Sequence, residues 1–106
     1  MKVALSAQGD RLESALDPRF GRAKYFLCVD LEKMTHECVE NLDGQNALQG
    51  AGINAATVVA GMGAEAVISG HVGPKALQAL KAAGIQVWLA GDASIGEAVE
   101  LFRRSE

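Results

Sequence analysis

The sequence predicts a single α/β domain in which helices pack on a mixed five-stranded sheet. Three observations support this prediction. The 106 residues suffice for one hydrophobic core, so we expect residues 1–106 to form one domain. The second half alternates helical periodicity with short apolar strands, which favours βαβ crossovers and a parallel sheet. The first half carries a hairpin pattern, which adds an antiparallel strand.

The first three strands are predicted from β-rich or alternating apolar segments. They are expected at residues 2–7, 25–29 and 34–41. Residues 30–33 are the expected hairpin loop, and the number of loop residues decides where two cysteines point. An odd number makes Cys28 and Cys38 face each other across the strand pair, whereas an even number places them on opposite faces. The sequence leaves both possibilities open.

The second half is predicted to contain three helices and two buried strands. The helices are expected at residues 51–62, at 74–83 and from 95 onwards, and the strands at 66–69 and 85–89. The almost wholly apolar composition of 51–62 predicts a helix packed on more than one side. Pro74 suits the first position of the next helix, where its missing N–H costs nothing. Ser94 and Glu97 form a capping box at the start of the last helix.

Composition and charge narrow the range of partners. The chain is 49% hydrophobic and 22% charged, with a net charge of −3. This charge argues against nucleic acid as a partner, because binding a phosphate backbone requires clustered Lys and Arg. No apolar run approaches the roughly 20 residues of a membrane helix, and residues 1–7 are too short for a signal-peptide core. We therefore expect a cytoplasmic protein with no membrane partner, in which the two cysteines are free thiols.

The polar segment of residues 8–22 is too long for a simple turn, so it either forms a short helical turn around 12–16 or is functional. Its end places Arg19 and Arg22 on either side of a phenylalanine and a glycine, directly before a buried strand. Two guanidinium groups at this spacing are suited to gripping an anion. The alternative, equally favoured, is a structural loop with a buried phenylalanine and arginines that are solvated or paired to Glu13 and Asp17.

A second candidate segment, residues 70–75, follows a predicted strand and leads into a helix. In parallel α/β sheets, ligands lie outside the carboxyl ends of strands, and helix N-termini attract anions. His71 lies where such a ligand would bind. The simpler interpretation is a surface histidine, since a lone loop histidine is more often that than a ligand.

Soft metal ligands occur on the predicted hairpin. His36 and Cys38 share one face of a strand, and Cys28 lies on the neighbouring strand. Thiolate and imidazole suit soft or borderline metals, but the spacing matches no closed zinc site and the chain has no CxxC motif. A buried cysteine and a half-exposed histidine without metal is the favoured interpretation.

Glycines recur in two GxGxxA patterns, at residues 50–55 and 61–66. The second lies at a helix end, and the first lacks the acidic residue expected of a dinucleotide site, so both are weak signals. Gly50 and Gly52 are interpreted as a flexible entry to the helix, and close approach to a ligand is the less favoured alternative. The first strand carries no carboxylate for a two-metal nuclease, and no Ser-His-Asp grouping stands out. We therefore expect no enzymatic activity.

Taken in order, the motifs of the chain resemble those of the dinitrogenase iron-molybdenum cofactor biosynthesis family, which includes NifX-like carriers, the C-terminal part of NifB-like proteins and the orange protein of sulfate reducers. The resemblance rests on Pro18-Arg19-Phe20-Gly21-Arg22-Ala23, Gly50-Ala51-Gly52-Ile53, Gly70-His71-Val72-Gly73-Pro74 and Leu80-Lys81-Ala82-Ala83-Gly84-Ile85. It implies a ribonuclease H-like fold with strand two antiparallel, and no nuclease activity. It also implies binding of an anionic metal-sulfur cluster or its precursor.

The hypothesis that follows is a small stand-alone carrier for a cluster containing molybdenum, iron or both, or copper, with cluster donor and acceptor proteins as further partners. The candidate cofactor-binding residues are Arg19, Phe20, Gly21, Arg22, Gly50, Gly52, His71 and Gly73. The candidate metal ligands are His71, Cys28, His36 and Cys38. The alternative is a metal-free protein-interaction or regulatory module. An anion-binding enzyme is least favoured, because no general base is placed beside the glycines.

Overall fold

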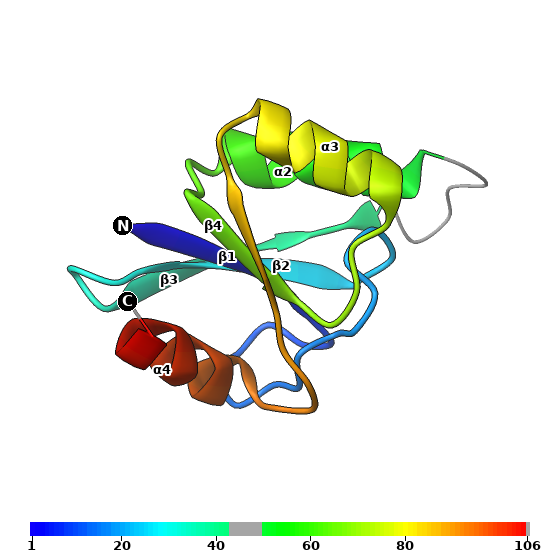
Figure 1. Ribbon diagram of the computed structural model, residues 1–106. Coiled ribbons are helices and arrows are strands. Elements are labelled where there is room, and N and C mark those ends of the chain that lie inside the picture. The colour runs from blue at the N-terminus through cyan, green and yellow to red at the C-terminus, as the bar shows by residue number, and fades with distance from the viewer. Residues whose placement is uncertain (43–49, 106) are drawn as a thin grey trace.

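A computed structural model of the chain describes residues 1–42 and 50–105 (Figure 1). In chain order its elements are β1 (Lys2–Ala7), β2 (Tyr25–Asp30), β3 (Thr35–Glu40), α2 (Ala51–Gly61), β4 (Ala66–Ser69), α3 (Pro74–Ala82), β5 (Gln86–Leu89) and α4 (Ile95–Ser105). The five strands form one sheet in the order β3-β2-β1-β4-β5. None of the described helices is long and apolar enough to cross a membrane.

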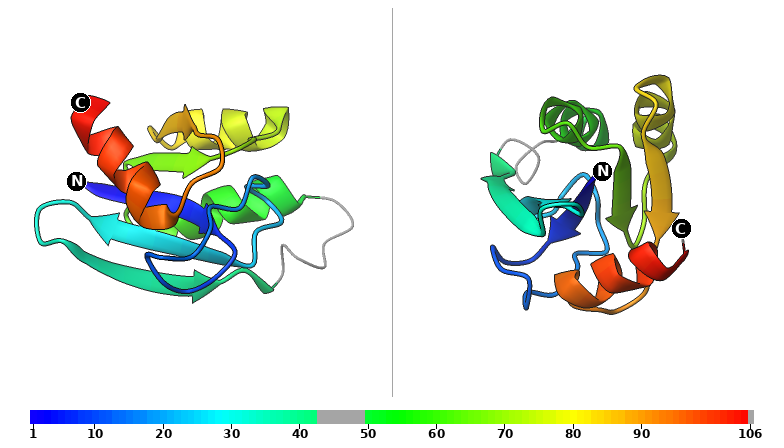
Figure 2. Two further views of the ribbon diagram at one scale, coloured as in Figure 1. Left: turned by 90° about the horizontal axis from the view of Figure 1, so that it is seen from below. Right: turned by 90° about the vertical axis from the view of Figure 1, so that its left-hand side faces the viewer.

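The sheet is mixed, as predicted. β2 runs antiparallel to both β1 and β3, whereas β1, β4 and β5 are parallel to one another. Helices α2 and α3 lie on one face of the sheet and α4 lies on the other (Figure 2). The parallel strands are joined through helices, as the alternation in the second half of the sequence requires.

The core consists of two apolar layers, one on each face of the sheet. Successive residues of β1 point to opposite faces, so Val3 and Leu5 join the layer under α4, while Ala4 joins the layer under α2 and α3. The buried side chain of Phe102 in α4 belongs to the first layer, and that of Leu80 in α3 belongs to the second. All of β1 except Lys2 is buried, because it is the central strand with helices on both sides.

Helix α2 differs from the prediction because it buries only one side. Its buried residues are Ala51, Ala55, Ala56 and Val59. Ile53 is 44% exposed, and Ala60 faces solvent. The apolar composition of this helix therefore does not mean burial all round. Its small residues instead allow close packing against α3 and the loop before β2.

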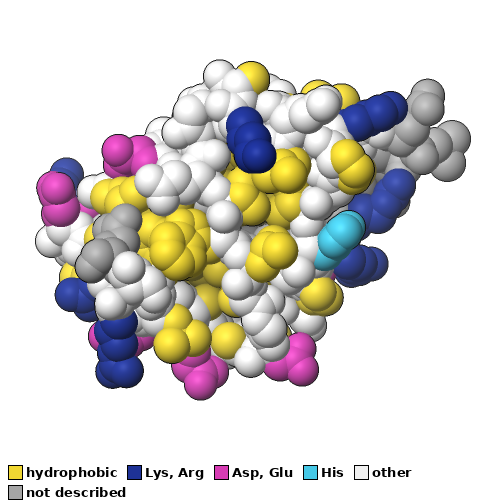
Figure 3. Space-filling model, viewed as in Figure 1, with side chains coloured by type: hydrophobic (Ala, Val, Ile, Leu, Met, Phe, Trp, Pro, Cys, Tyr) yellow, Lys and Arg dark blue, Asp and Glu magenta, His cyan; other side chains and the backbone are white. Residues whose placement is uncertain are grey.

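β5 also differs from the prediction, because it is an edge strand and not a buried one. Its two end residues are exposed and its two middle residues are half-buried, and Leu89 is 67% exposed. Hydrophobic side chains gather on this face of the molecule, over β5 and the helices beside it (Figure 3). An edge strand has a neighbouring strand on one side only, so its apolar side chains are less covered than those of a central strand.

The segment before β2 is not helical around residues 12–16. Isolated bridges join Ala7 to Leu16 and Ala15 to Ser94, and the Leu16 N–H donates to Ala93 O at 2.9 Å. The segment has one tight turn, in which the Ser14 N–H donates to Arg11 O at 3.0 Å, and it is otherwise held as a loop between the end of β1 and the start of α4.

The hairpin loop lies one residue later in the sequence than predicted, with the same number of residues. β2 continues through Asp30, so the loop has the four residues 31–34. Cys28 pairs with Glu37, and Leu27 pairs with Cys38. An even loop places the two cysteines on opposite faces of the sheet, which settles the question that the sequence left open.

The capping box at the start of α4 is confirmed. The Ser94 N–H donates to Glu97 Oε1 at 2.9 Å, and the Glu97 N–H donates to Ser94 Oγ at 3.1 Å. The hydrogen bond from the Ser94 backbone lowers the pKa of Glu97. α4 carries most of the apolar layer on its face of the sheet, so its N-terminus is a good place to test the fold.

Replacing Ser94 with alanine should lower the free energy of unfolding by about 1 kcal/mol, because the cap hydrogen bond is lost. Urea denaturation followed by circular dichroism measures the change, with Ser105→Ala, at the exposed C-terminal end of the same helix, as the control. The ionised Glu97 carboxylate also stabilises the folded protein, because its pKa is lower there than in the unfolded chain. This stabilisation is complete above the unfolded pKa and is lost as the pH falls through the lower, folded pKa. A destabilisation by S94A no larger than that by S105A would contradict the assigned role of the cap.

Candidate functional site

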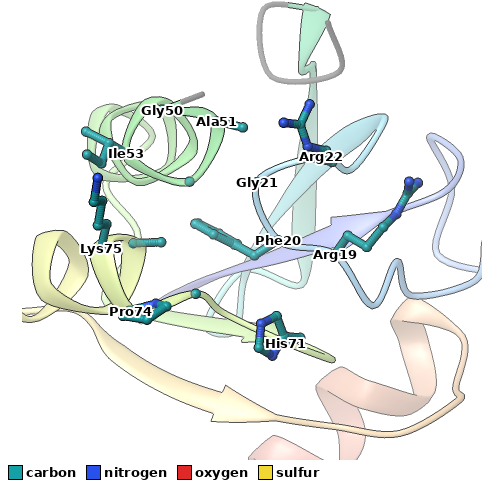
Figure 4. Close-up of a pocket in the computed structure, with 13 residues that line it drawn as sticks. Arg19, Phe20, Gly21, Arg22, Gly50, Ala51, Ile53, His71, Pro74 and Lys75 are labelled. Carbon is teal, nitrogen blue, oxygen red and sulfur yellow. The ribbon is translucent and has the colours of Figure 1, made fainter. Parts of the chain in front are cut away.

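A pocket of about 490 Å³ opens where the loop before β2 meets the N-termini of α2 and α3 (Figure 4). We call it the main pocket. It is lined by Arg19, Phe20, Gly21, Arg22, Gly50, Ala51, Gly52, Ile53, His71, Gly73, Pro74, Lys75 and Ala76. All eight residues predicted to bind a cofactor are therefore brought together around one cavity.

Two distant loops are joined directly at this pocket. Arg19 and His71 form an isolated parallel bridge, and the Phe20 N–H donates to His71 O at 3.2 Å. Next to this bridge, Gly70 packs against Pro18 in the loop before β2, so closely that a Cβ on Gly70 would lie 2.7 Å from Pro18 Cα. The segments 19–22 and 71–74 thus lie at the same end of the sheet.

A buried polar cluster anchors the loop under the pocket. Ser6 Oγ, at the end of β1, lies 2.7 Å from Asp17 O and 2.7 Å from Ser69 Oγ, at the end of β4. The Asp17 N–H donates to Ser6 O at 2.8 Å. Both serines are fully buried, so leaving either hydroxyl without a partner would be costly. The carboxyl ends of two parallel strands therefore fix the position of Asp17.

Asn41 holds the other end of the same loop. Its Nδ2 donates to Gly21 O at 3.1 Å and to Ala23 O at 2.9 Å, and its backbone N–H donates to Lys24 O at 2.9 Å. The residue is 4% exposed. A single buried amide thus fixes the backbone of the pocket wall between the two arginines and β2.

The glycines at the pocket serve packing and backbone conformation. A Cβ on Gly21 would lie 2.7 Å from Gly52 N, and a Cβ on Gly52 would lie 2.8 Å from Ala76 Cβ. The loop, α2 and α3 therefore meet in one close stack at the pocket. Gly50 has φ 79° at the N-cap of α2, a left-handed conformation that favours glycine. By contrast, Gly73 has open space around it.

The pocket combines an apolar interior with a positive rim. Phe20 points between the two helices, whereas Lys75 and His71 lie at the opening (Figure 4). Gly50 and Gly73, the N-cap residues of α2 and α3, supply no side chain to accept the first N–H groups of either helix. Neither first turn carries an acidic residue. Both helix N-termini therefore add positive potential to the pocket.

The two arginines differ in their surroundings. Asp17, which is 2% exposed, accepts hydrogen bonds from Arg19 N at 2.9 Å and from Arg19 Nε at 3.4 Å. The Arg19 side chain points away from the helices, whereas that of Arg22 points toward the start of α2 (Figure 4). Phe20 is buried, so the loop has the features of the structural alternative as well as those of an anion site.

The structure does not bring the predicted hairpin ligands to the main pocket, although His36 and Cys38 share one face of β3 as predicted. Cys28 lies on the face opposite His36 and Cys38, and none of the three lines the main pocket with His71. Within residues 1–42 and 50–105, no cluster of three or more His, Cys, Asp or Glu is suited to hold a metal ion. The even loop length is the physical reason for this correction.

The thiols are also poorly disposed to bind metal as thiolates. Burial, with a smaller contribution from Glu37, raises the pKa of Cys28. Partial burial, with smaller contributions from Asp10 and Glu40, raises the pKa of Cys38. Because the thiolate is the ligating form, both cysteines favour the protonated state that does not bind.

Several residues of the site lie outside the predicted set. Lys75 and Ala76 follow the predicted Gly73 directly, so the helix-start argument could have been extended to them. Ile53 similarly follows Gly52. Asn41 carries no local signal, because its role depends on a loop about 20 residues away in sequence that only the folded chain brings near.

Replacing Gly21 with alanine should lower the free energy of unfolding by about 1–3 kcal/mol, because the new methyl group overlaps the backbone of α2. Gly61→Ala is the control, since it adds the same group in open space at the exposed end of α2 and should not destabilise the protein, because alanine favours a helix over glycine. Thermal or urea unfolding distinguishes the two. Equal effects would show that the close stack of loop and helices is absent.

Replacing Asn41 with alanine should cost about 1–3 kcal/mol, because the Gly21 and Ala23 carbonyls lose their donor. Asn54→Ala, on the exposed side of α2, is the control and should be nearly neutral. Amide hydrogen exchange is the second measurement, and faster exchange confined to residues 19–24 is expected for N41A. Unchanged exchange there would contradict the role of Asn41 in holding the loop.

The chain is similar to several known proteins. The family model for the dinitrogenase iron-molybdenum cofactor matches residues 1–105. The protein MJ0580 of Methanocaldococcus jannaschii, whose function is uncharacterised, is 37% identical over 105 residues, covering 96% of this chain and 85% of that protein.

Several solved structures have the same fold as this chain. The apo form of the orange protein from Desulfovibrio gigas is 46% identical, with a TM-score of 0.94 over 98% of this chain and 88% of that one. TM1290 from Thermotoga, named as a candidate NifB protein, is 33% identical, with a TM-score of 0.85 over 97% and 87% of the two chains. PH0822 is 27% identical, with a TM-score of 0.82 over 100% and 93%. With a family model that spans residues 1–105, the chain belongs to the dinitrogenase iron-molybdenum cofactor family.

Proposed function

We propose that this protein is a small carrier that binds an anionic metal-sulfur cluster, or the precursor of one, in the main pocket. The cargo is of the iron-molybdenum cofactor type or a related molybdenum cluster that contains iron or copper. The observation that carries the proposal is the combination, in one cavity, of an apolar interior, a positive rim and an exposed imidazole.

The chemistry of such a cargo suits this cavity. A metal-sulfide cluster bears net negative charge, but its surface consists of polarisable sulfur atoms that accept only weak hydrogen bonds. Sulfur of this kind makes favourable contacts with aromatic and apolar groups such as Phe20 and Ile53. The net charge is balanced by Arg22, Lys75 and the two helix N-termini. His71 supplies one soft nitrogen ligand at the opening.

Family membership supports the same conclusion. The family is named for the iron-molybdenum cofactor, and the orange protein has the same fold at 46% identity. The strand order and the antiparallel second strand also support the ribonuclease H-like description that the resemblance implies. We extend the proposal to a cytoplasmic carrier that exchanges its cargo with donor and acceptor proteins.

We propose binding without catalysis. The thirteen residues that line the main pocket include no Asp, Glu, Ser, Thr or Cys. Among the described lining residues, a reaction in this cavity would find imidazole and ammonium groups for proton transfer, but no carboxylate, hydroxyl or thiol. Such a lining suits a site that holds its ligand unchanged.

The second candidate function is a protein-interaction or regulatory module. It is favoured by exposed apolar side chains beside β5, where Leu89 is 67% exposed and Leu101 is 58% exposed. A docking surface of this kind is compatible with a carrier but is also sufficient without cargo. The two functions differ in whether cluster binding depends on the main pocket.

Titration of the anaerobic protein with a copper-molybdenum or iron-molybdenum sulfide cluster tests the proposal. Binding is followed by visible absorbance, and a change in the charge-transfer bands is expected. Replacing His71 with alanine should weaken binding at least about tenfold, because a ligand to the metal is lost. His36→Ala is the matched control: it removes the other histidine, which lies on β3 away from the pocket, and should change affinity less than about twofold.

Failure of both clusters to change the absorbance of the wild-type protein would contradict the carrier function and favour the interaction module. Equal affinity for wild type and H71A would remove His71 from the site. Loss of binding in a Cys28→Ser or Cys38→Ser variant that keeps its melting temperature would instead locate the metal on the hairpin.

A further inference from the structure

The sheet has two edge strands, and they differ in how well they are protected from pairing with another strand. β3 forms one edge, and its residues are all exposed and include Glu37 and Glu40. Charged side chains on an edge strand oppose pairing with a further strand. β5 forms the other edge, and its residues Gln86–Leu89 carry neither a charge nor a proline. The β5 edge is therefore the one that is open to strand addition.

The backbone of β5 directs two of its residues away from the sheet. The N–H groups of Gln86 and Ala90 donate, each at 3.0 Å, to backbone oxygens at or next to the ends of β4. Backbone groups alternate in direction along a strand, so Val87 and Leu89 direct their N–H and C=O groups to the outer edge. β5 is the foremost strand in the view of Figure 1, and this outer edge faces the reader.

Apolar side chains flank the β5 edge on both faces of the sheet. On the α3 side, a groove of about 360 Å³ lies beside Val87 and Leu89 and includes Leu77 of α3. On the α4 side, a groove of about 290 Å³ lies beside Trp88 and Leu101. Leu89 and Leu101 are each more than half exposed, and apolar side chains gather over this region in Figure 3. A strand added at β5 would therefore cover apolar surface as well as backbone groups.

The β5 edge is complementary to a second copy of itself. In an antiparallel pair centred on Trp88, Val87 lies opposite Leu89 of the second copy, and Leu89 lies opposite its Val87. These residues direct their backbone groups outward, and residues paired in this way exchange two hydrogen bonds. Directly opposite residues lie on the same face, so each Leu89 reaches the groove on the α3 side of the other copy. A pair centred on Val87 or Leu89 would instead place an outward residue opposite a residue beyond the strand.

Charged residues near the two ends of β5 favour the same antiparallel arrangement. Lys81 lies in the last turn of α3 and lines the groove beside Gln86, at the start of β5. Asp92 is exposed and follows the end of β5. Within residues 1–42 and 50–105, neither takes part in a salt bridge. An antiparallel pair brings the start of each strand beside the end of the other, so Lys81 of each copy approaches Asp92 of the other.

We propose that two copies of this chain associate through their β5 edges into a two-fold symmetric dimer with one continuous sheet. The occupant is a second copy, because the register, the reciprocal insertion of Leu89 and the opposite charges all match under one two-fold rotation. The dimer also closes the assembly, since its outer edges are the β3 strands with Glu37 and Glu40. The inference goes beyond the proposed carrier, because it uses no residue of the main pocket and requires no cluster.

Sedimentation of the cluster-free protein over a range of concentrations tests the proposal. We expect a reversible monomer–dimer equilibrium with a dissociation constant of about 10–100 μM, since a short strand and its flanks are covered. Amide hydrogen exchange reports on the strand itself: exchange at Val87 and Leu89 should slow as the concentration rises, while exchange along β3 stays the same. A protein that remains monomeric up to about 1 mM would overturn the proposal and leave the β5 edge to a strand of a different protein.

Leu89→Lys and Val39→Lys form a matched pair, with one exposed apolar residue on each edge strand. L89K brings a cation to the apolar groove of the second copy and should raise the dissociation constant at least about tenfold. V39K places the same charge on β3 and should change it less than about twofold. The reverse pattern would locate the interface on β3, and equal effects would show association without a defined edge; either result would overturn the proposal. Melting temperatures show whether both variants are folded.

A charge exchange tests both the antiparallel arrangement and the second copy, at two exposed positions. Lys81→Asp and Asp92→Lys should each weaken self-association about three- to tenfold at low salt, because like charges then meet across the two-fold axis. An equimolar mixture of K81D and D92K should associate about as tightly as the wild type, because opposite charges meet again in the mixed dimer. If the mixture associates no more tightly than either variant alone, the proposed arrangement is wrong.

Discussion

The position of Asp17, held between the ends of β1 and β4, is the constraint on which the main pocket depends. Ser6 and Ser69 are fully buried, and their hydroxyls lie at hydrogen-bond distance from each other and around Asp17 O. Because buried hydroxyls are costly to leave without partners, the loop backbone has little freedom to move from the sheet. The Asp17 side chain then orients Arg19. The ends of the two strands therefore fix Asp17, and Asp17 fixes the loop that forms one wall of the main pocket.

This constraint also explains why the loop runs so close to its neighbours. With Asp17 fixed, the next residues pass between α2 and the segment after β4, where Gly21, Gly52 and Gly70 each leave no space for a Cβ. The glycines are therefore required by packing, and the cavity remains where the close stack ends. A pocket built in this way is largely formed before its ligand arrives, which lowers the entropic cost of binding.

The sequence predicts the fold and the convergence of the two loops for a general reason. The carboxyl ends of parallel strands meet at one edge, so motifs that follow β1 and β4 must lie near each other. The joint lining of the main pocket by Arg22 and His71 agrees with that rule. The hairpin register is not predictable in the same way, because it depends on where β2 ends and where β3 begins, and moving one of these bounds by a single residue exchanges the faces. The pairing of Arg19 with Asp17 is similar, since a pattern of residue types does not specify rotamers.

The carrier that we propose has to release its cargo, and the main pocket has the chemistry for release. Three or four thiolates would hold a metal cluster nearly irreversibly, whereas the main pocket offers one imidazole and a surrounding of apolar and cationic contacts. Many weak contacts give useful affinity while each can be broken in turn, so an acceptor protein that offers stronger ligands can remove the cluster at an adequate dissociation rate. The raised pKa of Cys28 has the same consequence, because a protonated, buried thiol does not compete for the metal during transfer. A chain with a net charge of −3 nevertheless places Arg19, Arg22 and Lys75 around the main pocket. In the proposed carrier this local positive field would draw an anionic cargo to the opening, and the single imidazole among the described lining residues would allow the cargo to leave again.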